Sequence, residues 1–249
     1  MKTHLPDTLF LQTTPSTNSY LSDLLSQGAF PHGYCVCSRF QSAGRGQAGN
    51  VWESADGENL LFSLLLHTHK FPLDRQFLLS EVVSIAICRF LSRYQISARI
   101  KYPNDIFVGD KKIAGILIEN RIVGKAMQYS IVGIGLNVNQ EVFIQNKATA
   151  TSMRSITGSR YSLTSLLQSL RHEILDRVDS FSIENKFECK ELYFSLLYRR
   201  DGYYPYEAEA DGVCFDAKIV DIADDGMLHL TTDKGEERKY YFKQVRFII

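Results

Sequence analysis

The chain has 249 residues, of which 45% are hydrophobic and 22% charged, a composition typical of a globular protein with one sizeable core. Its 28 Lys and Arg residues balance 28 Asp and Glu residues, so no overall basic charge would attract nucleic acid or an anionic membrane. No apolar run approaches the ~20 residues that span a bilayer, and the N-terminus does not read as a signal peptide.

The first part of the chain mixes strand and helix signals. A helix is expected to begin after Ser16, which can cap it, and to end near Gly28. The segment 41–51 contains three glycines and few apolar residues, which predicts a long loop. The expected strands are 8–13, 33–40 and 59–67.

Apolar residues recur at helical spacing over 74–94, the strongest helix signal in the chain. Short strand signals joined by tight turns follow, which is typical of an antiparallel meander. These strands are expected at 99–102, 106–108, 113–121 and 127–139. Two further helices are expected at 163–181 and 184–198.

After Arg200 the pattern changes to short strand candidates separated by Asp/Gly turns, which indicates a small β-barrel. The candidates are 207–210, 215–222, 227–232, 238–242 and 245–249. We therefore predict an α+β protein with a main domain at 1–200 and a small all-β domain at 201–249.

The cysteines are odd in number and form no Cys-x-x-Cys pair, which argues against a disulfide framework and a zinc site. We interpret all five as buried or half-buried small hydrophobic residues of a protein in a reducing, cytoplasmic compartment. They are Cys35, Cys37, Cys88, Cys189 and Cys214.

The loop at 41–50 reads QSAGRGQAGN. Backbone N–H groups of such a loop can approach phosphate oxygens, and Arg45 can bind a phosphate bidentately. No Gly-Lys-Ser/Thr follows, so it is not a P-loop. The spacing of Gly44, Gly46 and Gly49 leads into no amphipathic helix, so it is not a dinucleotide fingerprint. Taken alone, the loop is equally consistent with a flexible surface segment.

The segment 101–119 reads KYPNDIFVGDKKIAGILIE. Asn104 and Asp105 follow a strand end, where they can hold a polar ligand or a metal-bound phosphate. Strict alternation puts Lys112 and Ala114 on one face of the next strand, so that Lys112 points into a pocket beside Gly115. A solvated hairpin with exposed lysines is the competing interpretation.

The segment 133–139 reads GIGLNVN. Glycines inside a strand let a ligand or another backbone approach closely, and the asparagines offer both donors and acceptors. A β-bulge is the alternative explanation of this segment.

The ordered set QSAGRG, KYPND, KKIAGILIE and GIGLNVN closely resembles the biotin–protein ligase family. PSTN at 15–18 and ATS at 150–152 fit the same pattern, so motifs cover roughly residues 10–155. The resemblance implies a biotin/lipoate ligase-like catalytic domain with a mixed, largely antiparallel sheet, followed by an SH3-like β-barrel.

The resemblance further implies an ATP-dependent ligase that forms biotinyl-5'-AMP from biotin and ATP. The biotin would then pass to the ε-amine of a lysine on a biotin carboxyl carrier protein. Lys112 and Arg45 are the implied catalytic residues. The implied biotin site is Ser16, Thr17, Asn18, Gln41, Gly44, Arg45, Gly46, Gln47, Lys112 and Gly115. The implied ATP and adenylate site is Trp52, Asn104, Asp105, Asn137 and Ala150. Mg²⁺ would accompany ATP, with Asp105 as the candidate for a metal contact.

The sequence also departs from the family's pattern. Gln47 and Asn50 stand where relatives often carry basic residues, so we expect the adenylate to be held less tightly. Only a short segment precedes the Ser-Thr-Asn motif, so we expect a form without the DNA-binding domain of some members. The partners expected are therefore the carrier protein, no DNA and no membrane, with a homodimer left open. A lipoate–protein ligase or octanoyltransferase and a non-catalytic biotin sensor are the alternative functions.

Overall fold

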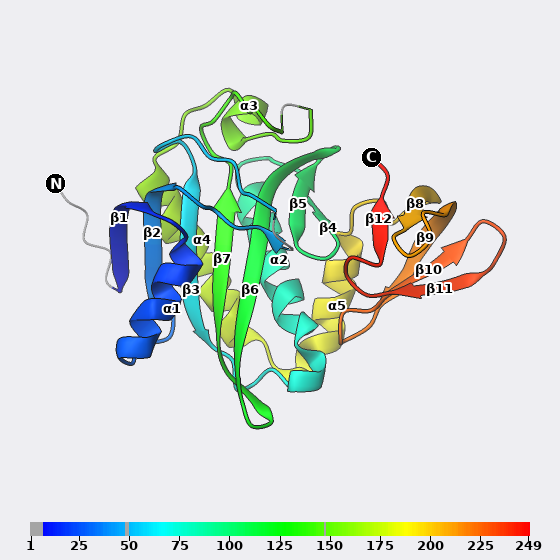
Figure 1. Cartoon of the computed structure of the whole chain (residues 1–249), viewed down its shortest axis with the longest axis horizontal. Helices are drawn as coiled ribbons and strands as arrows, with labels where there is room; N and C mark the ends of the chain where they lie inside the picture. The colour runs from blue at the N-terminus through cyan, green and yellow to red at the C-terminus, as the bar shows by residue number, and fades with distance from the viewer. Residues whose placement is uncertain (1–6, 48–49, 147) are drawn as a thin grey trace.

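The computed structural model describes residues 7–47, 50–146 and 148–249. Seven strands form one sheet in the order β1-β2-β3-β7-β6-β5-β4 (Figure 1). They are β1 (Thr8–Thr14), β2 (Cys35–Gln41), β3 (Leu60–His67), β4 (Arg99–Lys101), β5 (Asp105–Val108), β6 (Lys111–Val123) and β7 (Ala126–Leu136). β1 pairs with β2 in parallel and the other neighbours are antiparallel, which confirms the mixed, largely antiparallel sheet.

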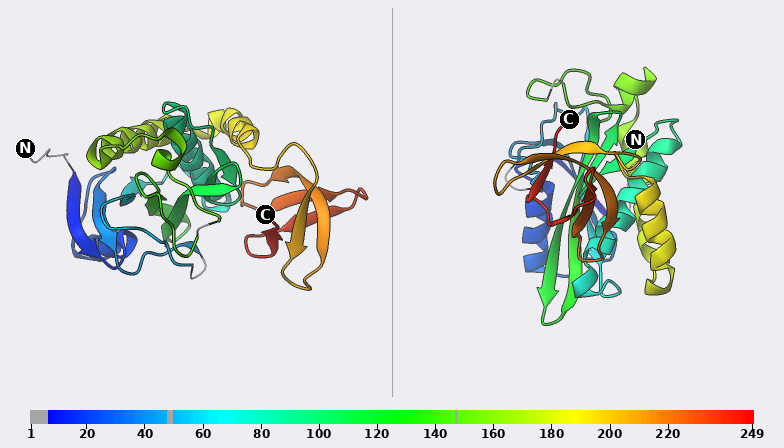
Figure 2. Two further views of the ribbon diagram at one scale, coloured as in Figure 1. Left: turned by 90° about the horizontal axis from the view of Figure 1, so that it is seen from above. Right: turned by 90° about the vertical axis from the view of Figure 1, so that its right-hand side faces the viewer.

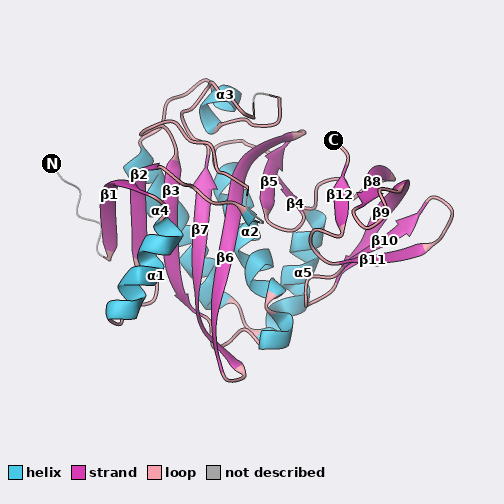
Figure 3. Cartoon of the chain, viewed as in Figure 1, coloured by secondary structure: helices cyan, strands magenta, loops and turns pink. Residues whose placement is uncertain are grey.

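Helices cover both faces of this sheet (Figures 2 and 3). Ser16 caps α1 (Thr17–Gln27) as expected, by accepting a hydrogen bond from the Ser19 N–H, and α1 packs on β2, β3 and β7. On the other face lie α2 (Phe77–Ser92) and α4 (Leu163–Ser180), with α5 (Lys186–Ser195) against α2. The short α3 (Met153–Thr157) lies beyond the end of the sheet. Among the described residues, no helix is long and apolar enough to cross a membrane.

A second, antiparallel sheet follows in the order β11-β10-β9-β8-β12 and lies beyond β4 (Figure 1). Its strands are β8 (Tyr204–Ala208), β9 (Cys214–Ile222), β10 (Leu228–Thr232), β11 (Glu237–Tyr240) and β12 (Val245–Phe247). The α+β class is therefore confirmed. The second sheet begins at Tyr204, after α5 ends at Ser195, and the domain boundary at 201 stays a prediction.

Two hydrogen bonds fix the chain around the link to the second sheet. Within the main part, the Tyr198 N–H donates to the Ile100 carbonyl of β4; between the two parts, the Tyr102 hydroxyl donates to the Gly226 carbonyl at 2.7 Å. The first bond explains why α5 ends at Ser195 rather than at the predicted 198, because the chain leaves the helix to pair with β4. Tyr102 therefore also anchors the second sheet.

The prediction for the cysteines is wrong at one position. Cys35, Cys37, Cys88 and Cys189 are buried, and burial raises the pKa of Cys37 to about 12. Cys214 is exposed, because it begins β9 beside the Asp211-Gly212 turn on the solvent side of the strand.

A carboxyl group is fully buried where α2 meets α5 and the second sheet. Neither oxygen of Glu81 has a hydrogen-bond partner among the described residues. Burial raises the pKa of Glu81 to about 8, against the attraction of Lys190 and Lys186 and with the repulsion of Asp224 and Asp221. The group is therefore largely protonated at neutral pH.

We predict that Glu81→Gln makes the protein less sensitive to alkaline pH. Unfolded Glu81 ionises near its ordinary value of 4.5, so the folded state holds an extra proton from there up to about 8, and stability falls as pH rises through this window. In urea unfolding, the free energy of unfolding of the variant relative to the wild type should rise by roughly 2 kcal/mol between about pH 5.5 and about pH 8. Parallel pH profiles for the two proteins would contradict this assignment.

Candidate functional site

Three glycines leave a bare patch of backbone on β6 and β7. Gly115 pairs with Gly135 across the two strands, and Gly133 lies two residues along β7. A Cβ atom on Gly133 would lie 2.3 Å from Asn18 Oδ1, and one on Gly135 would lie 2.4 Å from Trp52 Cε2. Side chains from other segments therefore rest directly on the sheet backbone, where the sequence predicted the approach of a ligand or another backbone.

A polar network forms one end of the site. The Thr17 N–H and hydroxyl donate to Gln41 Oε1 at 2.7 and 3.0 Å. Ser63 Oγ of β3 lies 2.7 Å from Thr17 Oγ1 and 2.6 Å from Asn18 Oδ1. The sequence analysis missed Ser63, although a single serine in the buried run LLFSLLLH is a recognisable signal.

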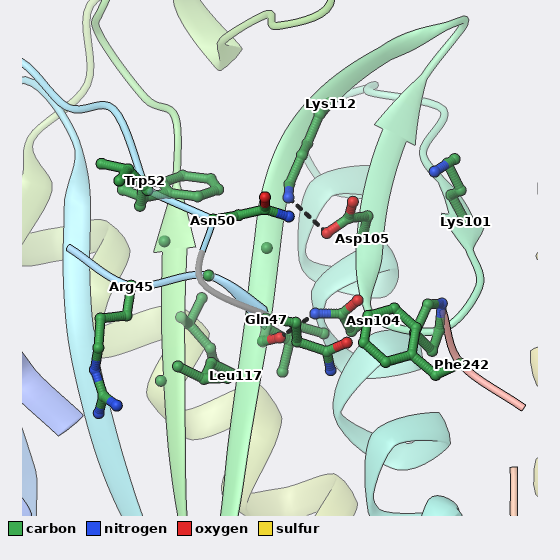
Figure 4. A pocket seen from close by; sticks show the side chains of 18 of the residues that line it. Arg45, Gln47, Asn50, Trp52, Lys101, Asn104, Asp105, Lys112, Leu117 and Phe242 are labelled. Carbon is green, nitrogen blue, oxygen red and sulfur yellow. Dashed lines mark hydrogen bonds and ion pairs between the residues drawn. The ribbon is translucent and has the colours of Figure 1, made fainter. Parts of the chain in front are cut away.

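The network continues to the arginine of the loop. Asn18 Nδ2 donates to Glu119 Oε2 at 2.6 Å, and Arg45 Nη2 lies 3.2 Å from both oxygens of Glu119. The Arg45 side chain therefore points away from Lys112 in this structure (Figure 4). The sequence predicted Arg45 but not its partner Glu119, which closes the KKIAGILIE motif. Ala48 and Gly49 of the same loop lie outside the described residues.

Lys112 reaches over the bare patch. Its Nζ lies 2.6 Å from Asp105 Oδ1 and 5.3 Å from the centre of a Trp52 ring (Figure 4). The ion pair and the aromatic ring hold the ammonium group at the centre of the site. The Lys112 side chain is 31% exposed.

A β-bulge corrects the predicted alternation of β6. Ile106 pairs with Ala114 but Phe107 pairs with Lys112, so Ile113 is an extra residue in β6. Lys112 and Ala114 therefore do not share a face: Ala114 is buried in the core, whereas Lys112 Nζ lies 3.2 Å from the position of a Cβ on Gly115. The predicted neighbourhood of Lys112 and Gly115 is right, but the bulge produces it.

Two cavities of about 560 Å³ each share Trp52 and Lys112. The first contains most residues of the expected biotin site, and the second extends toward the loop before α3. Lining the first are Ser16, Thr17, Asn18, Gln41, Arg45, Gly46, Gln47, Asn104, Asp105 and Gly115. Lining the second are Asn137, Ala150, Glu53, Phe143, Gln145, Asn146 and Thr149.

Three expected residues do not line the same cavity as the other members of their predicted sets. Gly44 lines neither of these cavities, and its carbonyl instead accepts the Trp52 N–H at 3.0 Å. Asn104 and Asp105, expected beside the nucleotide with Asn137, lie in the first cavity while Asn137 lies in the second.

The two asparagines are held differently. Asn104 Nδ2 donates to the Ile116 carbonyl at 2.5 Å, and the Asn104 carbonyl accepts the Ile116 N–H at 3.0 Å. These two bonds fix Asn104 to β6. Asn137 Nδ2 donates to the Thr151 carbonyl at 3.0 Å. Its buried Oδ1 has no partner within the described part of the chain, so it is free to accept a hydrogen bond from a ligand.

The second sheet supplies a wall that the sequence analysis missed. Phe242, Lys243 and Arg246 line the first cavity opposite the main sheet. Lys101 Nζ, also in this cavity, lies 5.0 Å from the Phe247 ring centre, and burial lowers the pKa of Lys101 despite the nearby carboxylate. No local signal could reveal this wall, because 242–247 begins 90 residues after Ser152, where the last motif ends.

The acidic side chains do not form a metal cage. In residues 7–47, 50–146 and 148–249, no three His, Cys, Asp or Glu side chains gather closely enough to hold a metal ion. Asp105, the expected metal contact, is instead engaged by Lys112.

Comparison with known proteins gives a match to a protein-family model and to several relatives. A model described as the biotin/lipoate A/B protein ligase family matches residues 10–137. The bifunctional ligase/repressor BirA of Bacillus spizizenii is 28% identical over 236 residues, covering 93% of this chain and 71% of that protein. The human biotin–protein ligase is 36% identical over 138 residues, covering 52% of this chain and 19% of that protein.

A solved structure agrees over nearly the whole chain. The biotin protein ligase from Aquifex aeolicus, in complex with biotin and ATP, has a TM-score of 0.79 and 25% sequence identity to this chain. The match covers 98% of this chain and 100% of that chain, so both sheets are included.

We predict that Gly135→Ala displaces Trp52, because the added Cβ would lie 2.4 Å from the indole ring. Trp52 is the single tryptophan of the chain, so its fluorescence reports this site alone. The emission should shift to longer wavelength as the ring becomes more exposed. Gly28→Ala, where the added Cβ meets nothing within 4 Å, is the matched control, and equal spectra for both variants would refute the close contact.

Proposed function

The chain belongs to the biotin/lipoate A/B protein ligase family, and on that premise we propose that it is a biotin–protein ligase. It forms biotinyl-5'-AMP from biotin and ATP and then transfers the biotinyl group to a lysine of a biotin carboxyl carrier protein. The observation that carries the proposal is the position of Lys112, where two cavities of suitable size meet. The similar Aquifex aeolicus enzyme was solved with both biotin and ATP bound.

The first cavity suits biotin. The ureido ring has one carbonyl acceptor and two N–H donors, which match the hydroxyl and amide groups around Thr17, Asn18 and Gln41. The glycine patch lets the flat bicyclic ring and its aliphatic chain lie against the sheet. This orientation directs the carboxylate of biotin toward Lys112.

The second cavity suits the adenosine half of ATP. The free Oδ1 of Asn137 can accept a hydrogen bond from an adenine amino group, and Trp52 offers an aromatic face between the two cavities. Ala150 leaves room for the base in the wall opposite. The α-phosphate then lies at the junction, next to the carboxylate of biotin.

Lys112 is the residue that makes the first step feasible. Two anions must meet when a carboxylate oxygen attacks the α-phosphorus and the bond to pyrophosphate breaks. An ammonium group fixed at the junction offsets this repulsion and stabilises the charge of the transition state. Mg²⁺ arrives with ATP as part of the substrate and neutralises the leaving pyrophosphate. Asp105 keeps Lys112 oriented until the biotin carboxylate and the α-phosphate replace Asp105 as its partners.

The second step uses the same cation. The neutral ε-amine of the carrier lysine attacks the acyl carbon, loses a proton as the amide forms, and expels AMP with the electrons of the acyl–oxygen bond. Lys112 stabilises the phosphate oxygens of the departing AMP. Arg45 can join it by leaving Glu119, because both side chains of that pair are about half exposed, at 47% and 40%, and such pairs contribute only ~0–1 kcal/mol. Gln47 and Asn50 carry no charge, so looser retention of the adenylate stays a prediction.

The polar end of the first cavity favours biotin over lipoate. A lipoyl group ends in an apolar dithiolane ring, which offers no hydrogen bonds to the polar groups of Thr17, Asn18 and Gln41. Sites built to hydrogen-bond a ligand strongly reject analogues that lack the matching groups. A non-catalytic sensor is disfavoured because both Lys112 and Arg45 are present in the first cavity.

The activity test offers the protein a choice of acid and carrier. With ATP, Mg²⁺ and equimolar biotin and lipoate, we expect intact-mass spectrometry to show biotin on a biotin carboxyl carrier domain and no change in a lipoyl domain. Lipoate on the lipoyl domain would move the function to the sister activity. Binding of biotin without transfer to either domain would favour the sensor.

We predict that Lys112→Ala slows adenylate formation by roughly a hundredfold or more, as does removal of other groups that stabilise transition-state charge. Pyrophosphate release in the absence of carrier measures this step. Lys111→Ala is the matched control, because the Lys111 side chain is exposed and lines neither cavity. Similar rates for the two variants would remove Lys112 from its proposed role.

A further inference from the structure

Glu53, which directly follows Trp52, receives four hydrogen bonds from one short segment. Its Oε1 accepts the Ile144 N–H at 2.5 Å, and its Oε2 accepts the N–H groups of Gln145 and Asn146 at 3.0 and 3.2 Å. The Asn146 side-chain amide adds a fourth bond at 3.1 Å. Burial works to raise the pKa of Glu53, but these donors outweigh it and lower the pKa, so the carboxylate is ionised at neutral pH.

Apart from these bonds, the segment accepts a side-chain hydrogen bond, from Gln140 Nε2 to the Val142 carbonyl at 2.9 Å. Among its apolar side chains Phe143 is buried, whereas Val142 and Ile144 are 75% and 86% exposed. The segment is neither helix nor strand, so regular backbone pairing does not support it. A charged acceptor that collects three consecutive N–H groups is therefore its main polar anchor.

The anchored segment leads directly to Lys112. The Asn146 carbonyl accepts the N–H groups of Thr149 and Ala150 at 3.1 and 2.9 Å. The Thr149 carbonyl accepts the Lys112 N–H at 2.8 Å, and the Lys112 carbonyl accepts the Thr151 N–H at 3.0 Å. Hydrogen bonds thus connect Glu53, through the wall of the second cavity, to the backbone that carries Lys112.

We propose that Glu53 is the positioning residue that keeps the second cavity preformed for the nucleotide. The inference rests on the proposed function and adds a residue to it. Glu53 itself need not touch ATP; it holds Gln145 and Asn146 as one wall and sets the distance of that wall from Trp52 and Lys112. The polar end of the first cavity makes none of these contacts, because its network is built from α1, β2 and β3.

Glu53→Gln tests the proposal with little change of shape. One oxygen remains, but an NH₂ group must face a backbone N–H, and the negative charge is lost. We expect the Kd and KM for ATP to rise by about tenfold or more, while the Kd for biotin and kcat at saturating ATP stay close to wild type. Isothermal titration with each ligand and initial rates of pyrophosphate release measure these quantities.

Ile144→Ala is the matched control, because it keeps the backbone N–H and removes only an exposed side chain. It should bind ATP like the wild type. An unchanged ATP affinity in Glu53→Gln would overturn the inference, and so would equal weakening of ATP and biotin, which would indicate general loosening. If the wild type binds ATP but transfers no biotin, the proposed function fails while the ATP titrations still decide the role of Glu53.

Discussion

The arrangement of the site depends on the absence of three side chains. Gly115, Gly133 and Gly135 make a flat area on two paired strands, and the side chains of Asn18, Trp52 and Lys112 occupy the space that Cβ atoms would need. A sheet with ordinary residues there would push these groups several ångströms outward and fill the cavities. The close approach therefore determines both the floor of the first cavity and the place where it meets the second.

Electrostatic restraint is the second feature that the site needs. Two cations of the site have a carboxylate partner, Asp105 for Lys112 and Glu119 for Arg45. Both pairs are accessible enough to exchange a carboxylate for a ligand anion at small cost. Glu53 differs because it accepts hydrogen bonds from neutral backbone N–H groups, and so it stabilises a loop rather than pairing with a cation. The three acids thus hold the two cations and the loop that surround the cavities.

The second sheet takes part in the site rather than being only an appendage. Phe242, Lys243 and Arg246 close one side of the first cavity, and the Tyr102 hydroxyl holds the turn at Gly226 against the main sheet. This explains why the KYPND motif has two tasks in this chain. Its asparagine and aspartate face the cavity, while its tyrosine maintains the position of the wall opposite.

The sequence by itself determined the elements and the identity of most site residues. Periodicity, caps and Asp/Gly turns are local properties, so α1, α2 and the strands of both sheets were predictable, and the ordered motifs pointed to Lys112, Arg45 and the Ser-Thr-Asn segment. The tertiary structure alone decided which of these residues meet. The bulge at Ile113 redirected Lys112, and long-range contacts brought in Ser63, Glu119, Glu53 and the wall at 242–247. Such pairings join segments tens to hundreds of residues apart, and chain folding sets them through backbone geometry that no local pattern records.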